Sequence, residues 1–500
     1  MSRFVLAIDN GTTSTRAIIF DENAQGIAQA QLPTAQVFPA PGWVEQSAAE
    51  VWDNTFKVIG QALTQAGISA DELSGLGITT QRETTICWNK TTGEVLHNAI
   101  VWQDTRTQDW LDAAFSESQR ERITELTGLP VTAYFSASKM RWLIDNVPAV
   151  QQLAHDANGS LAFGTPDAWI AWNLTGGING GRHVTDVTNA SRTSLMDMST
   201  LRWSEELCEL FGLSPSWLPE IVPSIGVIAP CVAPAPGAQL ACILGDQQAA
   251  SFGQCAVKPG QAKNTYGTGN FLMVNTGTQR VISHNGLIAT IAYQISGEQP
   301  HYALEGSVAV SGSLIQWLRD NLELISDANE AESLARSVED NGDVYVVPAF
   351  SGLFAPYWRP DARGVIVGLT RYVTKAHIVR ASLESTAFQS WDVIDAAQKD
   401  AHLDLNELRV DGGMVGNDLL MQFQADLLGI PVVRPAIAET TALGAAFGAG
   451  LATGVWSSQE QLEQLWHEDK RWLPTIDESK REQLITRWHK AVTKSLDWED

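Results

Sequence analysis

The chain has 500 residues, of which 44% are hydrophobic and 18% charged, a composition typical of a globular protein and too apolar for a disordered one. A single core rarely grows beyond roughly 250–300 residues, so we expect two domains. Lys and Arg number 33 against 57 acidic residues, and the resulting net charge of −24 argues against a nucleic-acid partner, since it repels phosphate backbones.

The first half of the chain predicts a hairpin, a helix and a buried strand. Residues 4–8 and 17–20 are apolar runs separated by Asn10-Gly11, a strong signal for a β-hairpin. Residues 47–66 carry apolar side chains at helical spacing. The apolar run 76–78 then leads into the polar residues 79–83, and open α/β sheets bind ligands at such strand ends.

The middle of the chain repeats the pattern of its beginning. A Pro-rich stretch, 215–236, predicts an irregular connection, and a strand at 241–244 follows it. Residues 264–274 form a second strand, Gly-Thr turn and strand, like the opening hairpin. This echo predicts a duplicated domain, and we place the division near residue 250, giving domains 1–250 and 251–500.

The last part of the chain predicts a long helix, a strand and a helical C-terminal region. Residues 378–398 place Leu, Ala, Trp and Ile on one helical face. The strand 408–410 ends in Asp411-Gly412-Gly413, and the charged segment from residue 457 onward predicts an amphipathic helix.

Several other classes of protein are disfavoured. The N-terminal sequence MSRFVLAIDNG is not expected to be a signal peptide, and no apolar run reaches the roughly 18 residues of a membrane span. The five cysteines are scattered and form no CxxC pair, and the nine histidines form no HxH or HxxxH pattern. We therefore expect a cytoplasmic protein without a disulfide framework or a cysteine zinc site.

Three glycine-containing turns are candidate phosphate sites. They lie at residues 10–16, 267–269 and 411–417. Glycine allows close approach of the backbone, and free N–H groups, hydroxyls and Arg16 can donate to phosphate oxygens. The first turn alone is equally an ordinary hairpin turn, the second alone is a weak signal, and the third alone is better interpreted as a routine β–α turn. Their order in two similar halves favours a nucleotide bound between the halves.

Two carboxylates follow predicted buried strands. Asp9 and Asp246 can each hold a divalent cation or act as a base, although a turn residue and a helix cap are the simpler interpretations. Arg82 and Glu83, also at a strand end, offer donors and an acceptor suited to a polyhydroxyl ligand. These residues alone predict an ATP-dependent or sugar-binding α/β protein.

The motifs as a set resemble the FGGY carbohydrate kinase family, and within it the members that phosphorylate glycerol. The likeness runs in unchanged order from residue 4 to about 455. Its segments are DNGTTSTR (9–16), PGWVE (41–45), QRETT (81–85), IVWQD (100–104), GDQQA (245–249), NTYGTGNF (264–271) and VDGG (410–413).

The resemblance implies two actin-like (ribonuclease H-like) α/β domains with a ligand cleft between them. It implies transfer of the γ-phosphoryl group of ATP, with Mg²⁺, to glycerol, giving sn-glycerol 3-phosphate and beginning glycerol catabolism. By position, Asp246 is the implied general base and Asp9 the metal-associated carboxylate. The implied glycerol site consists of Arg82, Glu83, Trp102, Tyr134, Asp246, Gln247 and Phe271. The implied nucleotide site consists of Thr12, Thr13, Ser14, Arg16, Thr268, Gly312, Gln316, Gly413 and Asn417.

Some expectations of the resemblance stay open. An FGGY kinase for another polyol or ketose, such as erythritol or xylulose, is the first alternative, and a non-catalytic actin-like nucleotide switch is the second. Relatives form dimers and tetramers, so we expect a homo-oligomer. Some bacterial members carry an arginine-containing loop that binds fructose 1,6-bisphosphate, but residues 233–239 contain no arginine, which predicts weak or absent inhibition by that sugar phosphate.

Overall fold

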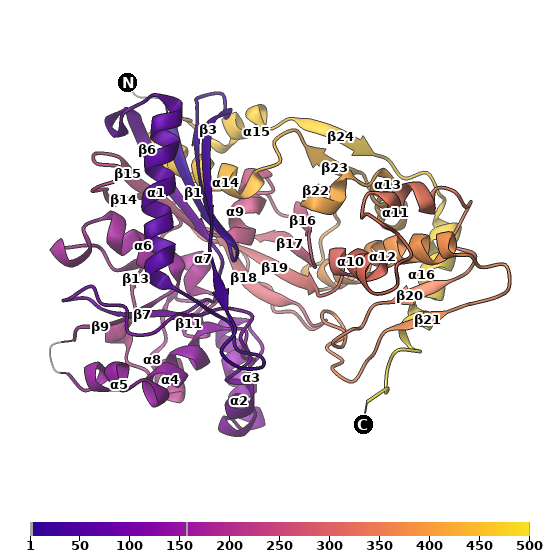
Figure 1. Cartoon of the computed structure of the whole chain (residues 1–500), viewed down its shortest axis with the longest axis horizontal. Coiled ribbons are helices and arrows are strands. Elements are labelled where there is room, and N and C mark those ends of the chain that lie inside the picture. Colours follow the sequence, from indigo (N-terminus) through magenta and orange to yellow (C-terminus); the bar gives the residue numbers. More distant parts are fainter. Residues whose placement is uncertain (1–3, 157–158, 500) are drawn as a thin grey trace.

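The computed structural model describes residues 4–156 and 159–499. Two α/β halves lie side by side, the N-terminal one at the left of Figure 1 and the C-terminal one at the right, and each contains one mixed β-sheet. The predicted α/β class is therefore confirmed. The exact residue at which the chain divides into domains stays a prediction.

The first sheet brings the ends of three parallel strands to one edge. Its antiparallel part is formed by β1 to β3, and β6 and β15 then add in parallel beside β1. Asp9 belongs to β1, Arg82 follows β6 and Asp246 follows β15, so these side chains meet at the carboxyl edge. The strands lie in the order β14 (Ile225–Pro230), β15 (Gln239–Gly245), β6 (Leu73–Thr80), β1 (Phe4–Asn10), β2 (Ser14–Phe20) and β3 (Gly26–Pro33).

The second sheet repeats the central strand arrangement of the first. Here β16, β17 and β19 form the antiparallel part, and β22 and β23 add in parallel beside β16. The repetition agrees with the sequence echo between the two hairpins. The strands lie in the order β18 (Ile288–Tyr293), β19 (His301–Val308), β17 (Asn270–Gly277), β16 (Ala262–Tyr266), β22 (Leu408–Asp411), β23 (Val432–Pro435) and β24 (Glu468–Trp472).

The two predicted long helices are present. Helix α1 begins after Ser47, whose hydroxyl accepts the N–H of Glu50, and ends before Gly67 in the left-handed conformation (φ 68°). Helix α12 covers the predicted 378–398 with three more residues at each end. The helices are α1 (Ala48–Ala66), α2 (Gln108–Ala114), α3 (Glu117–Thr127), α4 (Ser136–Asn146), α5 (Pro148–Ala154), α6 (Pro166–Leu174), α7 (Val187–Ala190), α8 (Glu205–Phe211), α9 (Asp246–Gly253), α10 (Gly312–Asp320), α11 (Glu330–Ala335), α12 (Lys375–Ala401), α13 (Asp418–Leu428), α14 (Thr440–Thr453), α15 (Gln459–Leu465) and α16 (Glu478–Val492).

Short strands complete the secondary structure and carry several loops near the site. They are β4 (Gln36–Val37), β5 (Glu45–Gln46), β7 (Ile86–Asn89), β8 (Ala99–Ile100), β9 (Leu161–Gly164), β10 (Val184–Asp186), β11 (Met196–Asp197), β12 (Arg202–Trp203), β13 (Glu220–Val222), β20 (Tyr345–Val347) and β21 (Val365–Val367).

Helix α14 crosses from the C-terminal part of the chain onto the first sheet, where it contacts β1, β6 and β15 (Figure 1). The approach is so close that a Cβ atom on Gly77 of β6 would lie 2.2 Å from the backbone oxygen of Ala445. Helix α9 packs on α14 in the same way, since a Cβ on Gly444 would lie 1.8 Å from the oxygen of Ala249. Direct backbone contact therefore fixes the helix that begins with Asp246.

Two expectations from the sequence were wrong. The Pro-rich stretch 215–236 is not irregular throughout, because β13 and β14 lie within it. Strand β14 is at the edge of the sheet, where a proline such as Pro230 costs no ladder hydrogen bond. The C-terminal region is not helical throughout, because β24 lies between α15 and α16 and extends the second sheet beside β23.

Within the described part of the chain, no helix combines the length and the apolarity needed to cross a membrane.

Candidate active site

Arg82 and Asp246 form the centre of the site. The Nε atom of Arg82 lies 3.1 Å from Oδ1 of Asp246. The Arg82 side chain is 3% exposed, whereas the Asp246 side chain is 32% exposed. The carboxylate is thus the more accessible member of the pair.

Glu83 has an unusual backbone and a buried ion pair. Its φ of 61° lies in the left-handed region, which non-glycine residues adopt mainly where surrounding structure holds them. Its Oε1 accepts the Nε–H of Arg192 at 2.6 Å, and both side chains are at most 2% exposed. Burial raises the pKa of Glu83, although Arg192 and Arg82 oppose this. Glu83 is therefore not part of a surface ion pair.

Asp9 lies near charged groups of both signs. Burial raises its pKa to about 7, Arg16 opposes the shift, and the nearby carboxylates of Asp246 and Glu439 add to it. Among the described residues, no group of three or more His, Cys, Asp or Glu could hold a metal ion alone. Magnesium commonly binds through one or two carboxylates together with waters and substrate phosphates, so the Asp9 environment fits such an ion.

Aromatic rings stand beside the first phosphate turn. Trp102 and Tyr134 contact edge to face, with ring centroids 5.6 Å apart. The Trp102 Nε1–H donates to Oγ1 of Thr12 at 3.0 Å. The predicted apolar wall of the glycerol site is thereby tied to the predicted nucleotide turn.

Lys263 joins two other predicted glycerol residues. Its Nζ donates to Oε1 of Gln247 and to Oγ1 of Thr265, the second at 2.9 Å, and lies 3.4 Å from the backbone oxygen of Phe271. The lysine side chain is fully buried. Because the Gln247 oxygen is occupied, its amide N–H groups remain to face a ligand.

The second and third glycine turns converge on the start of α10. The N–H of Gly312 donates to the oxygen of Gly267 at 2.9 Å, and that of Ser311 donates to the oxygen of Thr268 at 3.0 Å. A Cβ on Gly312 would lie 2.5 Å from the Gly267 oxygen and 3.4 Å from Sδ of Met414. Gln316 lies one turn further along α10 and is exposed.

The turn after β22 joins the strand to a helix, as the sequence predicts. A 3₁₀ turn, Gly413–Gly416, follows the strand, and α13 begins at Asp418. Asn417 caps that helix, its Oδ1 accepting the N–H of Leu420 at 2.9 Å. Gly412 has a φ of 95°, and a Cβ there would lie 2.4 Å from the oxygen of Tyr266. Only glycine allows this turn to approach the second hairpin.

The first glycine turn is joined to the other half of the chain. The N–H of Gly11 donates to the oxygen of Ser14 at 3.0 Å, which closes the turn, and Thr13 is exposed at its tip. Arg16 forms an ion pair with Glu439, the residue before α14. The predicted phosphate residues of this turn and of β2 are thus held against the segment that also borders Asp9.

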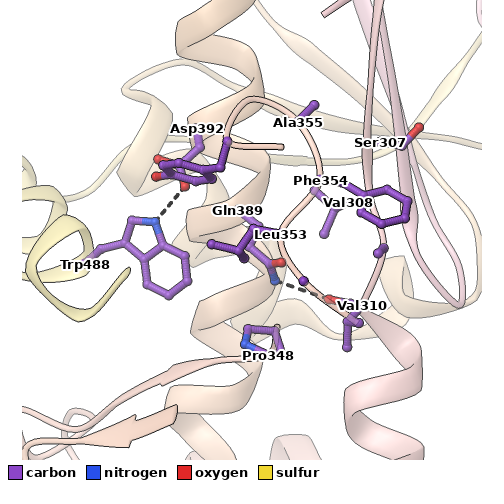
Figure 2. A pocket seen from close by; sticks show the side chains of 13 residues that line it. Ser307, Val308, Val310, Pro348, Leu353, Phe354, Ala355, Gln389, Asp392 and Trp488 are labelled. Carbon is purple, nitrogen blue, oxygen red and sulfur yellow. Dashed lines mark hydrogen bonds between the residues drawn. The ribbon is translucent and has the colours of Figure 1, made fainter. Parts of the chain in front are cut away.

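A small cavity lies behind the entry to α10 (Figure 2). Its volume is about 10 Å³, room for no more than one water molecule. Gln389 of α12 donates to the oxygen of Val310 across it at 3.2 Å, and Trp488 donates to Asp392 at 2.7 Å (Figure 2). The cavity is therefore too small to hold a nucleotide.

Comparison with known proteins identifies the family. Residues 4–253 match the N-terminal domain of the FGGY family of carbohydrate kinases, and residues 262–453 match its C-terminal domain. The chain belongs to the FGGY family of carbohydrate kinases.

Relatives within the FGGY family are similar over the whole chain. A glycerol kinase of Pseudarthrobacter chlorophenolicus is 56% identical, and one of Leifsonia xyli is 55% identical; each match covers 100% of this chain and 99% of the relative. The crystal structure of Plasmodium falciparum glycerol kinase with ADP matches with a TM-score of 0.93 at 37% identity, over 99% of this chain and 98% of that one. This confirms the two actin-like domains expected from the sequence.

A more distant solved structure agrees in fold. Xylulose kinase from Lactobacillus acidophilus matches with a TM-score of 0.86 at 22% identity, over 98% of this chain and 97% of that one. At this identity the match speaks for the fold alone.

Four buried or paired charges at this FGGY site were not predicted from the sequence. Lys263 directly precedes the recognised NTYGTGNF segment, and Glu305 interrupts an apolar run at 302–310. A charged residue within an apolar strand must be paired when it is buried, so such a residue in the sequence indicates a buried ion pair. Arg192 and Glu439 lie in polar segments that carry no such signal. The four residues are Arg192, Lys263, Glu305 and Glu439.

Lys139 holds the loop that carries Tyr134. Its fully buried Nζ donates to the backbone oxygens of Ala133, Tyr134 and Phe135, at 2.6, 2.7 and 3.2 Å. Burial lowers the pKa of Lys139 to about 7, although Glu83 and Asp104 oppose the shift.

Replacing Lys139 by Met is expected to change how stability depends on pH. The unfolded lysine keeps its proton up to about 10.5, whereas the folded one loses it near 7. Between these values the unfolded state binds more protons, so the wild-type protein gains stability as the pH rises. Urea unfolding at pH 7 and pH 9 should show a larger gain for the wild type than for Lys139→Met. Equal gains would mean that the folded lysine stays charged.

Proposed function

We propose that this protein transfers the γ-phosphoryl group of ATP to a terminal hydroxyl of glycerol, giving sn-glycerol 3-phosphate and ADP. The observation that carries the proposal is the 54–56% identity to glycerol kinases over the full length of the chain. The match to a glycerol kinase structure with ADP supports the nucleotide.

Asp246 is the proposed general base. A primary alcohol is a weak nucleophile until its proton has an acceptor, and the partly exposed carboxylate of Asp246 supplies one. Arg82 and Glu83 orient the glycerol hydroxyls by donating and accepting hydrogen bonds, together with the amide of Gln247. Tyr134 completes this hydrogen-bonding set, and Trp102 and Phe271 contact the carbon backbone of glycerol.

The nucleotide is proposed to lie along the three glycine turns. Backbone N–H groups and hydroxyls near Thr12, Thr268 and Gly413 bind its phosphates, which leaves phosphoryl transfer to positioning and charge stabilisation. Asp9 would hold Mg²⁺ together with those phosphates. Magnesium bound there neutralises the charge on the transferring group.

A coupled assay of ATP consumption tests the proposal. Turnover is expected with glycerol and Mg²⁺ and to fall to background without glycerol. The larger substrates erythritol and xylulose should give lower kcat/KM, because Trp102, Tyr134 and Phe271 are expected to narrow the pocket around glycerol. A higher kcat/KM with either of them would instead favour the alternative FGGY kinase.

Fructose 1,6-bisphosphate is expected to inhibit weakly or not at all. Residues 233–239, which connect β14 and β15, contain no arginine or lysine to bind its phosphates. Initial rates measured over a titration to millimolar inhibitor should stay constant, and strong inhibition would contradict this expectation.

We also propose a cellular compartment and an oligomeric state for the enzyme. We expect it to act in the cytoplasm as a homo-oligomer, a dimer or tetramer. Light scattering coupled to size-exclusion chromatography measures the oligomeric state directly.

A further inference from the structure

A chain of five charges of alternating sign runs behind the proposed glycerol site. It begins at Glu83, passes through Arg192, Glu305 and Arg82, and ends at Asp246. The first four side chains are at most 3% exposed, and only the last one is partly open. Charges buried this deeply remain ionised only when each has a partner.

Glu305 is the central member of this chain. Both Nη atoms of Arg82 donate to its two oxygens, at 2.5 and 3.0 Å. Its Oε1 also accepts the Nη2–H of Arg192 at 3.1 Å. Together the two arginines lower the pKa of Glu305 to about 2 against the effect of burial, so it is ionised at neutral pH.

The two-point contact determines where Arg82 points. A guanidinium is planar and rigid, so anchoring both Nη atoms on one carboxylate sets the direction of the remaining Nε–H. That Nε lies 3.1 Å from Asp246, the proposed base. Glu305 thereby positions the guanidinium that forms the ion pair with the proposed base.

Arg192 connects Glu305 to Glu83. It contacts Glu83 through Nε and Glu305 through Nη2, so one guanidinium links two buried carboxylates. Its charge also lies over the rings of Tyr134 and Phe135, at 5.9 and 5.3 Å from their centroids. Without Glu305, Arg192 and Arg82 would be like charges that share no acceptor between them.

Glu305 comes from the other half of the molecule. It lies on β19, opposite Met273 of β17 and Ile288 of β18 in the second sheet. We propose that Glu305 is a positioning residue for glycerol, contributed by the second domain, that sets the orientations of Arg82 and, through Arg192, of Glu83. The inference rests on the proposed function.

The variant Glu305→Gln tests this role, with Glu384→Gln as its matched control. Glu384 is also a buried glutamate in contact with an arginine, Arg380, at 2.9 Å, but it lies on α12 and contacts none of the proposed substrate residues. Because misplacing a reacting group by about 1 Å can cost about 10²-fold, kcat/KM for glycerol should fall by about that factor in Glu305→Gln. KM for ATP should stay within about twofold, and the control should retain wild-type kinetics.

A purely structural role predicts a different result. Glu305→Gln would then have the same kinetics as the control, or its kinetic constants for glycerol and for ATP would worsen by the same factor. Either result overturns the proposal. If Glu305→Gln does not fold, Arg192→Lys is the second test, because lysine keeps the charge but cannot span both carboxylates. It should raise KM for glycerol and leave KM for ATP unchanged; unchanged glycerol kinetics would overturn the proposal. A wild-type protein without glycerol-dependent turnover would contradict the proposed function itself, and this inference with it.

Discussion

Replacing Asp246 by Asn is expected to lower kcat by about 10²–10⁴-fold, the usual contribution of a general base. Asparagine keeps the shape of the side chain and an oxygen that can accept the Arg82 Nε–H now 3.1 Å from Oδ1. It cannot take up the glycerol proton. Coupled ATP consumption measures kcat, and calorimetry should show that glycerol still binds.

The control for this variant is Asp109→Asn. Asp109 lies in the first turn of α2, as Asp246 does in α9, but it is exposed and is not one of the proposed substrate residues. Its kcat should equal that of the wild type. If Asp246→Asn also retains wild-type kcat, another group accepts the proton and the assignment of the base is wrong.

Replacing Gly444 by Ala is expected to destabilise the protein by about 3 kcal/mol or more, at or above the upper end of ordinary overpacking. The new Cβ would lie 1.8 Å from the oxygen of Ala249, a backbone atom that cannot rotate away. Helices α9 and α14 must separate to admit it. Since α9 begins with Asp246, kcat should fall as well.

Gly60→Ala provides the comparison for this second variant. Gly60 lies within α1, and no heavy atom stands within 4 Å of the added Cβ. Alanine should therefore stabilise the helix by up to about 1 kcal/mol. Urea denaturation of both variants measures the two effects, and a Gly444→Ala protein as stable as the wild type would refute the close helix contact.

Much of the fold could be predicted from the sequence, because hairpin turns and helix caps depend on residues that are close together in the chain. The Asn10-Gly11 turn between apolar runs predicts the hairpin of β1 and β2, and the Ser47 and Gly67 caps bracket α1. Edge strands β14 and β24 were missed. Their proline and charged residues resemble those of loops, and they become strands only by pairing with β15 and β23.

Only part of the candidate site could be predicted from the sequence. The resemblance pointed to Arg82, Glu83 and Asp246, and these three residues do lie close together after the ends of parallel strands. Their roles stay predictions until the variants are measured. No motif indicated Glu305 or Arg192, although they contact two of the three.

The sequence by itself determined the local elements, the glycine turns and, through its motifs, the family. Only the tertiary structure decided which charges meet. Glu83 and Arg192 are 109 residues apart, and Arg82 and Glu305 are 223 apart, so no periodicity or spacing connects them. Buried charges need partners within hydrogen-bond distance. Helix α9 packs on α14 and contacts strands of both sheets, and this packing brings the partners together.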